Sequence, residues 1–106
     1  MTGEAVSIRL EPTLPSVAMS RIFIVSVLAA AGADDTTVEN ARVFISDVST
    51  GLVSEGAEIL IEARFADGGA SLGGNLPGLV PEAGSLLLGD LLEISENRWT
   101  LTVPTR

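Results

Sequence analysis

Apolar side chains recur at intervals of three and four residues through residues 36–53, near the middle of the chain. This spacing is typical of the buried face of an α-helix. The apolar stripe consists of Val38, Ala41, Ile45, Val48 and Leu52. Thr36 and Glu39 have the spacing of a capping box, so the pattern predicts that the helix begins at Thr36. The opposite face carries Asn40, Asp47 and Gly51, and the last two are neighbours one helical turn apart.

Residues 16–31 predict a second helix, which is apolar on most of its sides. Ser16 is a suitable N-cap, and Gly32 suits the left-handed conformation that ends a helix. We expect this helix to lie against both a sheet and the neighbouring helix. Its apolar run resembles a signal-peptide core, but no basic cluster precedes the run and it is too short to span a bilayer. The sequence therefore predicts a cytoplasmic protein with no membrane partner.

Three segments alternate between apolar and polar side chains, which predicts half-buried strands. They are residues 6–10, 58–65 and 99–103, and we expect Trp99 in the core. Residues 66–83 contain five glycines and two prolines, and they predict a long glycine-rich loop. Residues 84–94 predict a third helix, although Gly89 lies within it.

The expected order is strand, helix, helix, strand, long loop, helix, strand, and no repeat or linker divides it. A chain of 106 residues is long enough for one domain, so we assign residues 1–106 to a single domain. The strands alternate in polarity, whereas strands covered by helices on both faces are apolar throughout. We therefore predict an α+β fold, a two-layer sandwich with the helices packed on one face of a mostly antiparallel sheet.

The composition excludes several kinds of chemistry. The chain has no cysteine, histidine or lysine, which removes disulfides, thiolate and imidazole chemistry, and any Walker A or Schiff-base lysine. The net charge is −8 and the six arginines are scattered, so we expect no nucleic-acid partner. An acidic surface keeps a domain soluble or attracts a basic protein partner.

Three stretches carry a family pattern. Residues 14–32 begin a helix with Pro15 and Arg21, which fit a Pro-x-x-x-x-x-Arg spacing. Residues 38–53 fit a helix with an acidic box, and residues 84–104 combine a glycine- and leucine-rich helix, a short turn and a last strand. Together they resemble the small ATP-binding domain of histidine kinases and bacterial anti-sigma-factor serine kinases, the GHKL or Bergerat fold. The resemblance implies a histidine kinase-like ATPase domain over most of the chain.

The resemblance also implies roles for single residues. In the family, the glutamate of a Glu-x-x-x-Asn box orients the attacking water or hydroxyl, and the asparagine binds Mg²⁺. Asp47 matches the glutamate, and Gly51, which has no ligating side chain, matches the asparagine. Asp67-Gly68-Gly69 is the nearest match to the adenine-binding Asp-x-Gly-x-Gly loop, but it directly follows the first strand after this helix, so we interpret it as a turn. The second strand, which precedes this loop in the family, is missing from the pattern.

We therefore expect no catalytic residue, no metal ligand and no cofactor. If ATP and Mg²⁺ bind, the resemblance gives Asp47 as the catalytic carboxylate, and it gives Asp47, Asp67, Gly69 and Gly84 as nucleotide contacts. It implies a non-catalytic regulatory domain that binds a protein partner, such as a sigma factor or an anti-sigma antagonist, and that could form a homodimer. Two alternatives stay open: an ATP-binding anti-sigma-factor serine/threonine kinase, and a structural or oligomer-forming module.

Overall fold

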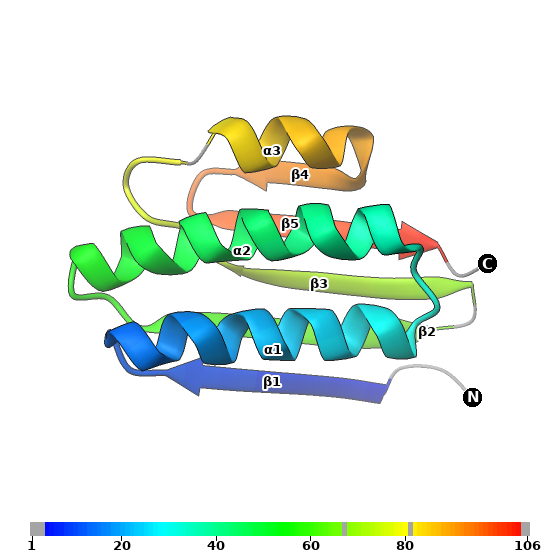
Figure 1. Cartoon of the computed structure of the whole chain (residues 1–106), viewed down its shortest axis with the longest axis horizontal. Helices are drawn as coiled ribbons and strands as arrows, with labels where there is room; N and C mark the ends of the chain where they lie inside the picture. Colours follow the sequence, from blue (N-terminus) through cyan, green and yellow to red (C-terminus); the bar gives the residue numbers. More distant parts are fainter. Residues whose placement is uncertain (1–3, 67, 81, 105–106) are drawn as a thin grey trace.

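The computed structural model of the protein describes residues 4–66, 68–80 and 82–104. Its elements are β1 (Glu4–Leu10), α1 (Leu14–Ala30), α2 (Asp35–Ser54), β2 (Ile59–Ala66), β3 (Gly69–Asn75), α3 (Glu82–Leu88), the 3-10 turn η1 (Gly89–Leu91), β4 (Leu92–Ser95) and β5 (Arg98–Pro104). Figure 1 shows α1 and α2 as long antiparallel helices side by side, with the shorter α3 beside α2.

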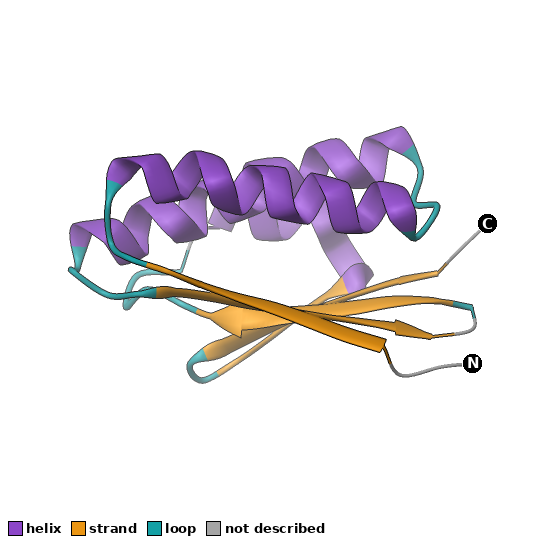
Figure 2. Cartoon of the chain, turned by 90° about the horizontal axis from the view of Figure 1, so that it is seen from below, coloured by secondary structure: helices purple, strands orange, loops and turns teal. Residues whose placement is uncertain are grey.

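The elements form two layers. The five strands make one sheet in the order β1-β2-β3-β5-β4, and every neighbouring pair is antiparallel. All three helices lie on the same side of this sheet, and no described helix covers its other face (Figure 2). This arrangement confirms the predicted α+β sandwich. It also places the two long helices side by side, as the sequence predicted.

The core lies between the two layers. The predicted stripe of α2 is confirmed, because Ala41, Ile45, Val48 and Leu52 are buried against the sheet and α1. From the sheet, β2 contributes Ile59, Ile61 and Ala63, the inward positions that its alternation predicted. Trp99 of β5 is fully buried, and its ring meets that of Phe44 edge to face, with centroids 5.5 Å apart.

The long loop predicted over residues 66–83 is wrong for its first half. Gly69–Asn75 forms β3, which lies between β2 and β5 in the middle of the sheet. Glycine has a low preference for strands, and this hid the element from pattern analysis. At Gly74 the lack of a side chain is required, because a β-carbon there would collide with the carbonyl oxygen of Leu60 and lie 2.9 Å from Nε1 of Trp99. That indole nitrogen has no hydrogen-bond partner among the described residues.

The third helix is shorter than predicted. It ends at Leu88, and Gly89 has a φ of +55°, a left-handed conformation that suits glycine. The chain then turns through η1 into β4, which pairs with β5 and places Ile94 opposite Trp99. Residues predicted as the end of a helix therefore form the edge strand of the sheet.

Both long helices begin earlier than predicted. The N-cap of α2 is Asp34, whose Oδ1 accepts a 2.7 Å hydrogen bond from the backbone N–H of Thr37. The capping box of Thr36 and Glu39 is therefore wrong. The first helix begins at Leu14 instead of Ser16, with a proline in its first turn. Gly32 has a φ of +81° and follows the helix end, as expected.

Candidate functional site

Asp47 and Gly51 lie on the side of α2 that faces the segment between β3 and α3. Asp47 is exposed, and together with Thr50 and Gly51 it forms one wall of an open hollow of about 570 Å³. The other wall consists of Leu79, Val80 and Glu82. We call this the α2 hollow. It contains both positions that the sequence resemblance singled out on α2.

Gly51 is closely covered by this segment. A β-carbon built on Gly51 would lie 2.9 Å from both Cβ and Cγ of Pro77. Carbon atoms pack at larger separations in protein interiors, so position 51 has room for a hydrogen atom and no side chain without movement of the proline. The ring of Pro77 therefore occupies the space in which an asparagine side chain at position 51 would begin.

A hydrogen bond holds the segment at the C-cap of α2. The backbone N–H of Gly78 donates to Oε2 of Glu55 at 2.7 Å. A bond to an ionised carboxylate is stronger than one between neutral groups. The segment is thus attached to α2 and to its C-cap, through Pro77 on Gly51 and through Gly78 on Glu55.

The charge in the α2 hollow is negative. Asp47 and Glu82 contribute carboxylates, none of the described residues that line the hollow is basic, and residues 65–97 contain no arginine. A triphosphate would meet like charges here, and position 51 offers no side-chain ligand for Mg²⁺. Within the described ranges, no group of three or more His, Cys, Asp and Glu residues is arranged to hold a metal ion. These residues do not fit Mg-ATP bound as in the family.

The remaining nucleotide candidates lie in different places. Gly84 lets α3 approach α2 closely, since a β-carbon there would lie 2.8 Å from Cα of Phe44, one turn before Val48. Gly69 is the first residue of β3, and Pro77 comes after the last residue of that strand. Because β3 has 7 residues, its two ends are about 20 Å apart. Asp67 lies outside the described residues. The structure therefore brings Asp47 and Gly84 to the same helix pair and leaves Gly69 apart.

Sequence reasoning missed Phe44 and Pro77. Phe44 belongs to the same series as Asn40, Asp47 and Gly51, and it is almost completely buried. An aromatic residue in that series was a signal that this side of α2 is also covered. No local pattern marked Pro77, because its contact with Gly51 depends on the unpredicted strand β3 that precedes it.

A second hollow lies on the outer surface of the helix layer. It measures about 400 Å³ and is lined by Ala18, Arg21, Ile22, Val25, Ser26 and Arg42; we call it the α1–α2 hollow. Ile22 is 66% exposed and Met19 of the same helix is 53% exposed. The first helix therefore presents apolar side chains to solvent as well as to the core.

The two arginines of the α1–α2 hollow differ in their partners. Arg42 hydrogen-bonds to Glu39, and this bond holds the pKa of the Glu39 carboxyl below its ordinary value. Nη1 of Arg21 donates to the hydroxyl of Ser46 at the long distance of 3.4 Å. No carboxylate pairs with Arg21 among the residues that the structure describes.

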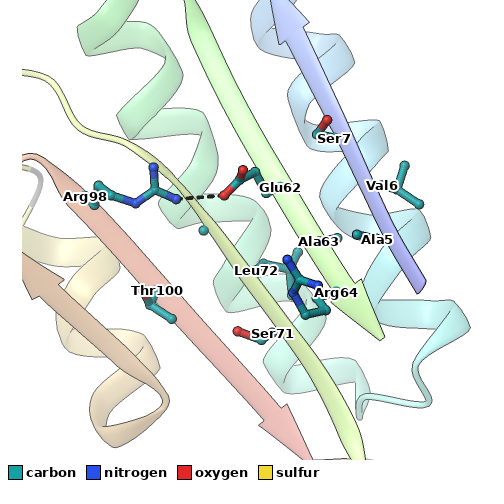
Figure 3. A pocket seen from close by; sticks show the side chains of 11 residues that line it. Ala5, Val6, Ser7, Glu62, Ala63, Arg64, Ser71, Leu72, Arg98 and Thr100 are labelled. Atoms are coloured by element: carbon teal, nitrogen blue, oxygen red, sulfur yellow. Dashed lines mark hydrogen bonds and ion pairs between the residues drawn. The ribbon is translucent and has the colours of Figure 1, made fainter. Parts of the chain in front are cut away.

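A third hollow, of about 220 Å³, lies on the sheet face that carries no helix (Figure 3). The side chain of Arg98 reaches over Gly73 to Glu62, with 2.9 Å between Nη2 and Oε1. Exposed ion pairs of this kind contribute little to stability. Of the candidate site residues that the structure describes, none lines this hollow.

Comparisons with known proteins bear on the fold. No protein-family model matches the sequence, and no curated protein sequence matches it. The chain is similar to the crystal structure of the RsbU and RsbW domains of Rv1364c from Mycobacterium tuberculosis, with a TM-score of 0.71 and 23% sequence identity. The match covers 97% of this chain and 33% of that chain, so this chain spans about a third of its length.

At this level of identity the likeness shows the fold alone. The fold agrees with the GHKL-like fold that the sequence resembles. Among the described residues, no helix is both long enough and apolar enough to cross a membrane.

Proposed function

We propose that the chain is a cytoplasmic regulatory domain that acts by binding another protein, in the manner of an anti-sigma factor, without catalysing phosphoryl transfer. Two observations support the regulatory class: the sequence resembles anti-sigma-factor serine kinases, and the fold is shared with a structure that contains an RsbW domain. The single observation that carries the non-catalytic part is the packing of Pro77 on Gly51.

The packing matters because it removes the space for a metal ion as well as a side-chain ligand. Water can complete an octahedral Mg²⁺ shell when a side chain is missing, so a glycine alone would be tolerated. Here the space beside Gly51 is taken by a proline ring, and the charged side chains that line the hollow are the carboxylates of Asp47 and Glu82. Neither the room nor the charge favours a metal-bound triphosphate.

Isothermal titration with ATP and Mg²⁺ tests the non-catalytic part. We expect no saturable heat and no transfer of phosphate to protein. A micromolar Kd, or phosphate release that Asp47→Ala abolishes, would overturn this part and favour the kinase. The kinase alternative has one observation in its support, since Asp47 is exposed to the hollow, as a carboxylate that orients the attacking group must be.

The α1–α2 hollow is the surface that best suits a protein partner. Ala18, Ile22 and Val25 give it an apolar lining, Met19 is exposed on the same helix, and the guanidinium of Arg21 has no carboxylate partner among the described residues. Exposed apolar surface rimmed by polar groups is typical of protein-binding sites. The resemblance points to sigma factors and their antagonists as the partners to test.

The binding test uses purified sigma factors and anti-sigma antagonists from the same organism. We expect one of them to bind, and we expect Ile22→Ser and Arg21→Gln each to weaken that complex by about tenfold, or about 1.4 kcal/mol. Arg64→Gln removes an arginine from the sheet face and serves as the matched control, with affinity unchanged. Equal losses in Arg21→Gln and Arg64→Gln would assign the effect of the arginine to net charge, and an unchanged affinity in Ile22→Ser would contradict the proposed surface.

A further inference from the structure

The α2 hollow is lined by a large apolar side chain that is exposed to solvent. Leu79 is 87% exposed, and Leu86 of the nearby α3 is 80% exposed. The two residues before Leu79 are fixed on α2, because Pro77 packs on Gly51 and the N–H of Gly78 bonds to Glu55. The exposure of Leu79 is therefore imposed by the attachment of its neighbours. In Figure 1 this segment is the yellow connection that passes the C-terminal half of α2.

Two carboxylates flank this apolar surface. Asp47 lies one helical turn before Gly51, and Glu82 begins α3; both are exposed. Neither of them forms an ion pair with the residues that the structure describes. The third acid nearby, Glu55, already accepts the hydrogen bond from Gly78. The hollow thus combines a mostly apolar wall with two carboxylates that are available to a ligand.

From this combination we propose that the α2 hollow binds a basic segment of a partner protein. An apolar side chain of the segment packs on Leu79 and Val80, and a neighbouring arginine or lysine lies between Asp47 and Glu82. Arginine suits this position because its planar guanidinium can bond to two carboxylates at once. The net charge of −8 adds long-range attraction for a basic partner. The proposal concerns a second surface and does not depend on the α1–α2 hollow.

Fluorescence anisotropy with synthetic peptides tests this proposal. The probe is a short fluorescein-labelled peptide in which arginines alternate with leucines, and the matched peptide has glutamates in place of the arginines. We expect the basic peptide to bind and the acidic peptide to fail. The double variant Asp47→Asn with Glu82→Gln should weaken binding by about tenfold or more, and Leu79→Ser should weaken it by a similar factor. All three substitutions are at exposed positions, so the variants keep the fold.

The control removes the same charge elsewhere. Glu11→Gln with Glu93→Gln neutralises two exposed carboxylates that do not line the hollow and should change the affinity by less than about twofold. Equal weakening by both double variants would show that the net charge attracts the peptide and would overturn the site. Failure of the basic peptide to bind, or its displacement by micromolar Mg-ATP, would overturn it as well. If the peptide test fails while a protein partner still binds at the α1–α2 hollow, the proposed function is unaffected.

Discussion

Gly51 of α2 and Pro77 of the segment after β3 are in contact because position 51 has no side chain; a β-carbon there would lie 2.9 Å from two ring carbons of the proline. The glycine lies within the helix, where alanine is favoured by about 1 kcal/mol. The helix therefore accepts an unfavourable residue at the position where the proline ring is packed.

A double-mutant cycle tests this contact. We expect Gly51→Ala to destabilise the protein by about 1–2 kcal/mol, because overpacking outweighs the gain in helix preference. In a Pro77→Gly background the same substitution should stabilise it by about 1 kcal/mol. Urea unfolding of the four proteins measures the coupling. Equal effects in both backgrounds would contradict the packing.

Gly74→Ala should be more damaging than Gly73→Ala. A β-carbon at position 74 would collide with a backbone carbonyl and the indole of Trp99, whereas at position 73 its nearest neighbours are 3.2 Å away. We expect a loss of about 3 kcal/mol for the first substitution, at the upper end for overpacking, and about 1 kcal/mol for the second. Thermal unfolding of the two variants makes the comparison. A reversed order would mean that Trp99 does not lie against β3.

Asp34→Ala should lower the free energy of unfolding by about 1 kcal/mol, because it removes the N-cap of α2. Thr36→Ala is the matched control and should have an effect within about 0.5 kcal/mol, since Thr36 is inside the first turn and exposed. Chemical unfolding of both variants distinguishes the two caps. A larger loss for the Thr36 variant would restore the capping box that the sequence suggested.

The pair formed by Glu39 and Arg42 predicts a small pH dependence. The hydrogen bond from Arg42 lowers the pKa of the Glu39 carboxyl in the folded protein, so the pair stabilises the fold above the ordinary carboxyl range and is lost as the pH falls through the lowered pKa. Glu39→Gln should therefore lower the urea midpoint slightly at neutral pH and leave it unchanged in strong acid. Both groups are exposed, so added salt should also reduce the difference. A difference that persists in acid would rule out this pair as its cause.

The sequence predicted the elements whose side chains keep one period. The stripe of α2 and the alternation of β2 identified the core faces correctly, because burial on one side selects those spacings. The hydrophobic pattern did not predict elements whose residues are determined by contacts with neighbouring elements. In β3, Gly74 is required by the approach of Leu60 and Trp99, and a required glycine looks the same in sequence as a loop glycine.

The sequence indicated two positions on one face of α2 and did not indicate the residues that surround them. Asp47 and Gly51 could be found from a family pattern on one helix. Pro77, Glu82 and Leu79 come from a segment whose path depends on β3, which the pattern did not contain. The start of α2 failed for a local reason: Asp34, Asp35, Thr36 and Thr37 are all acceptable caps, and propensity does not choose among them.

The pairing of β1 with β2 has a consequence for folding kinetics. Leu10 lies opposite Ile59 in this ladder, so residues 11–58, with both long helices, form the connection that the ladder closes. Closing a long flexible chain costs entropy that the strand contacts must repay later. A preformed helical hairpin, joined through the hydrogen bond of Ser20 and Ser49, brings the two strand ends together at lower cost. The rate-limiting step should therefore contain α1 and α2, and substitutions between them should slow folding, whereas substitutions in the β4–β5 hairpin should mainly speed unfolding.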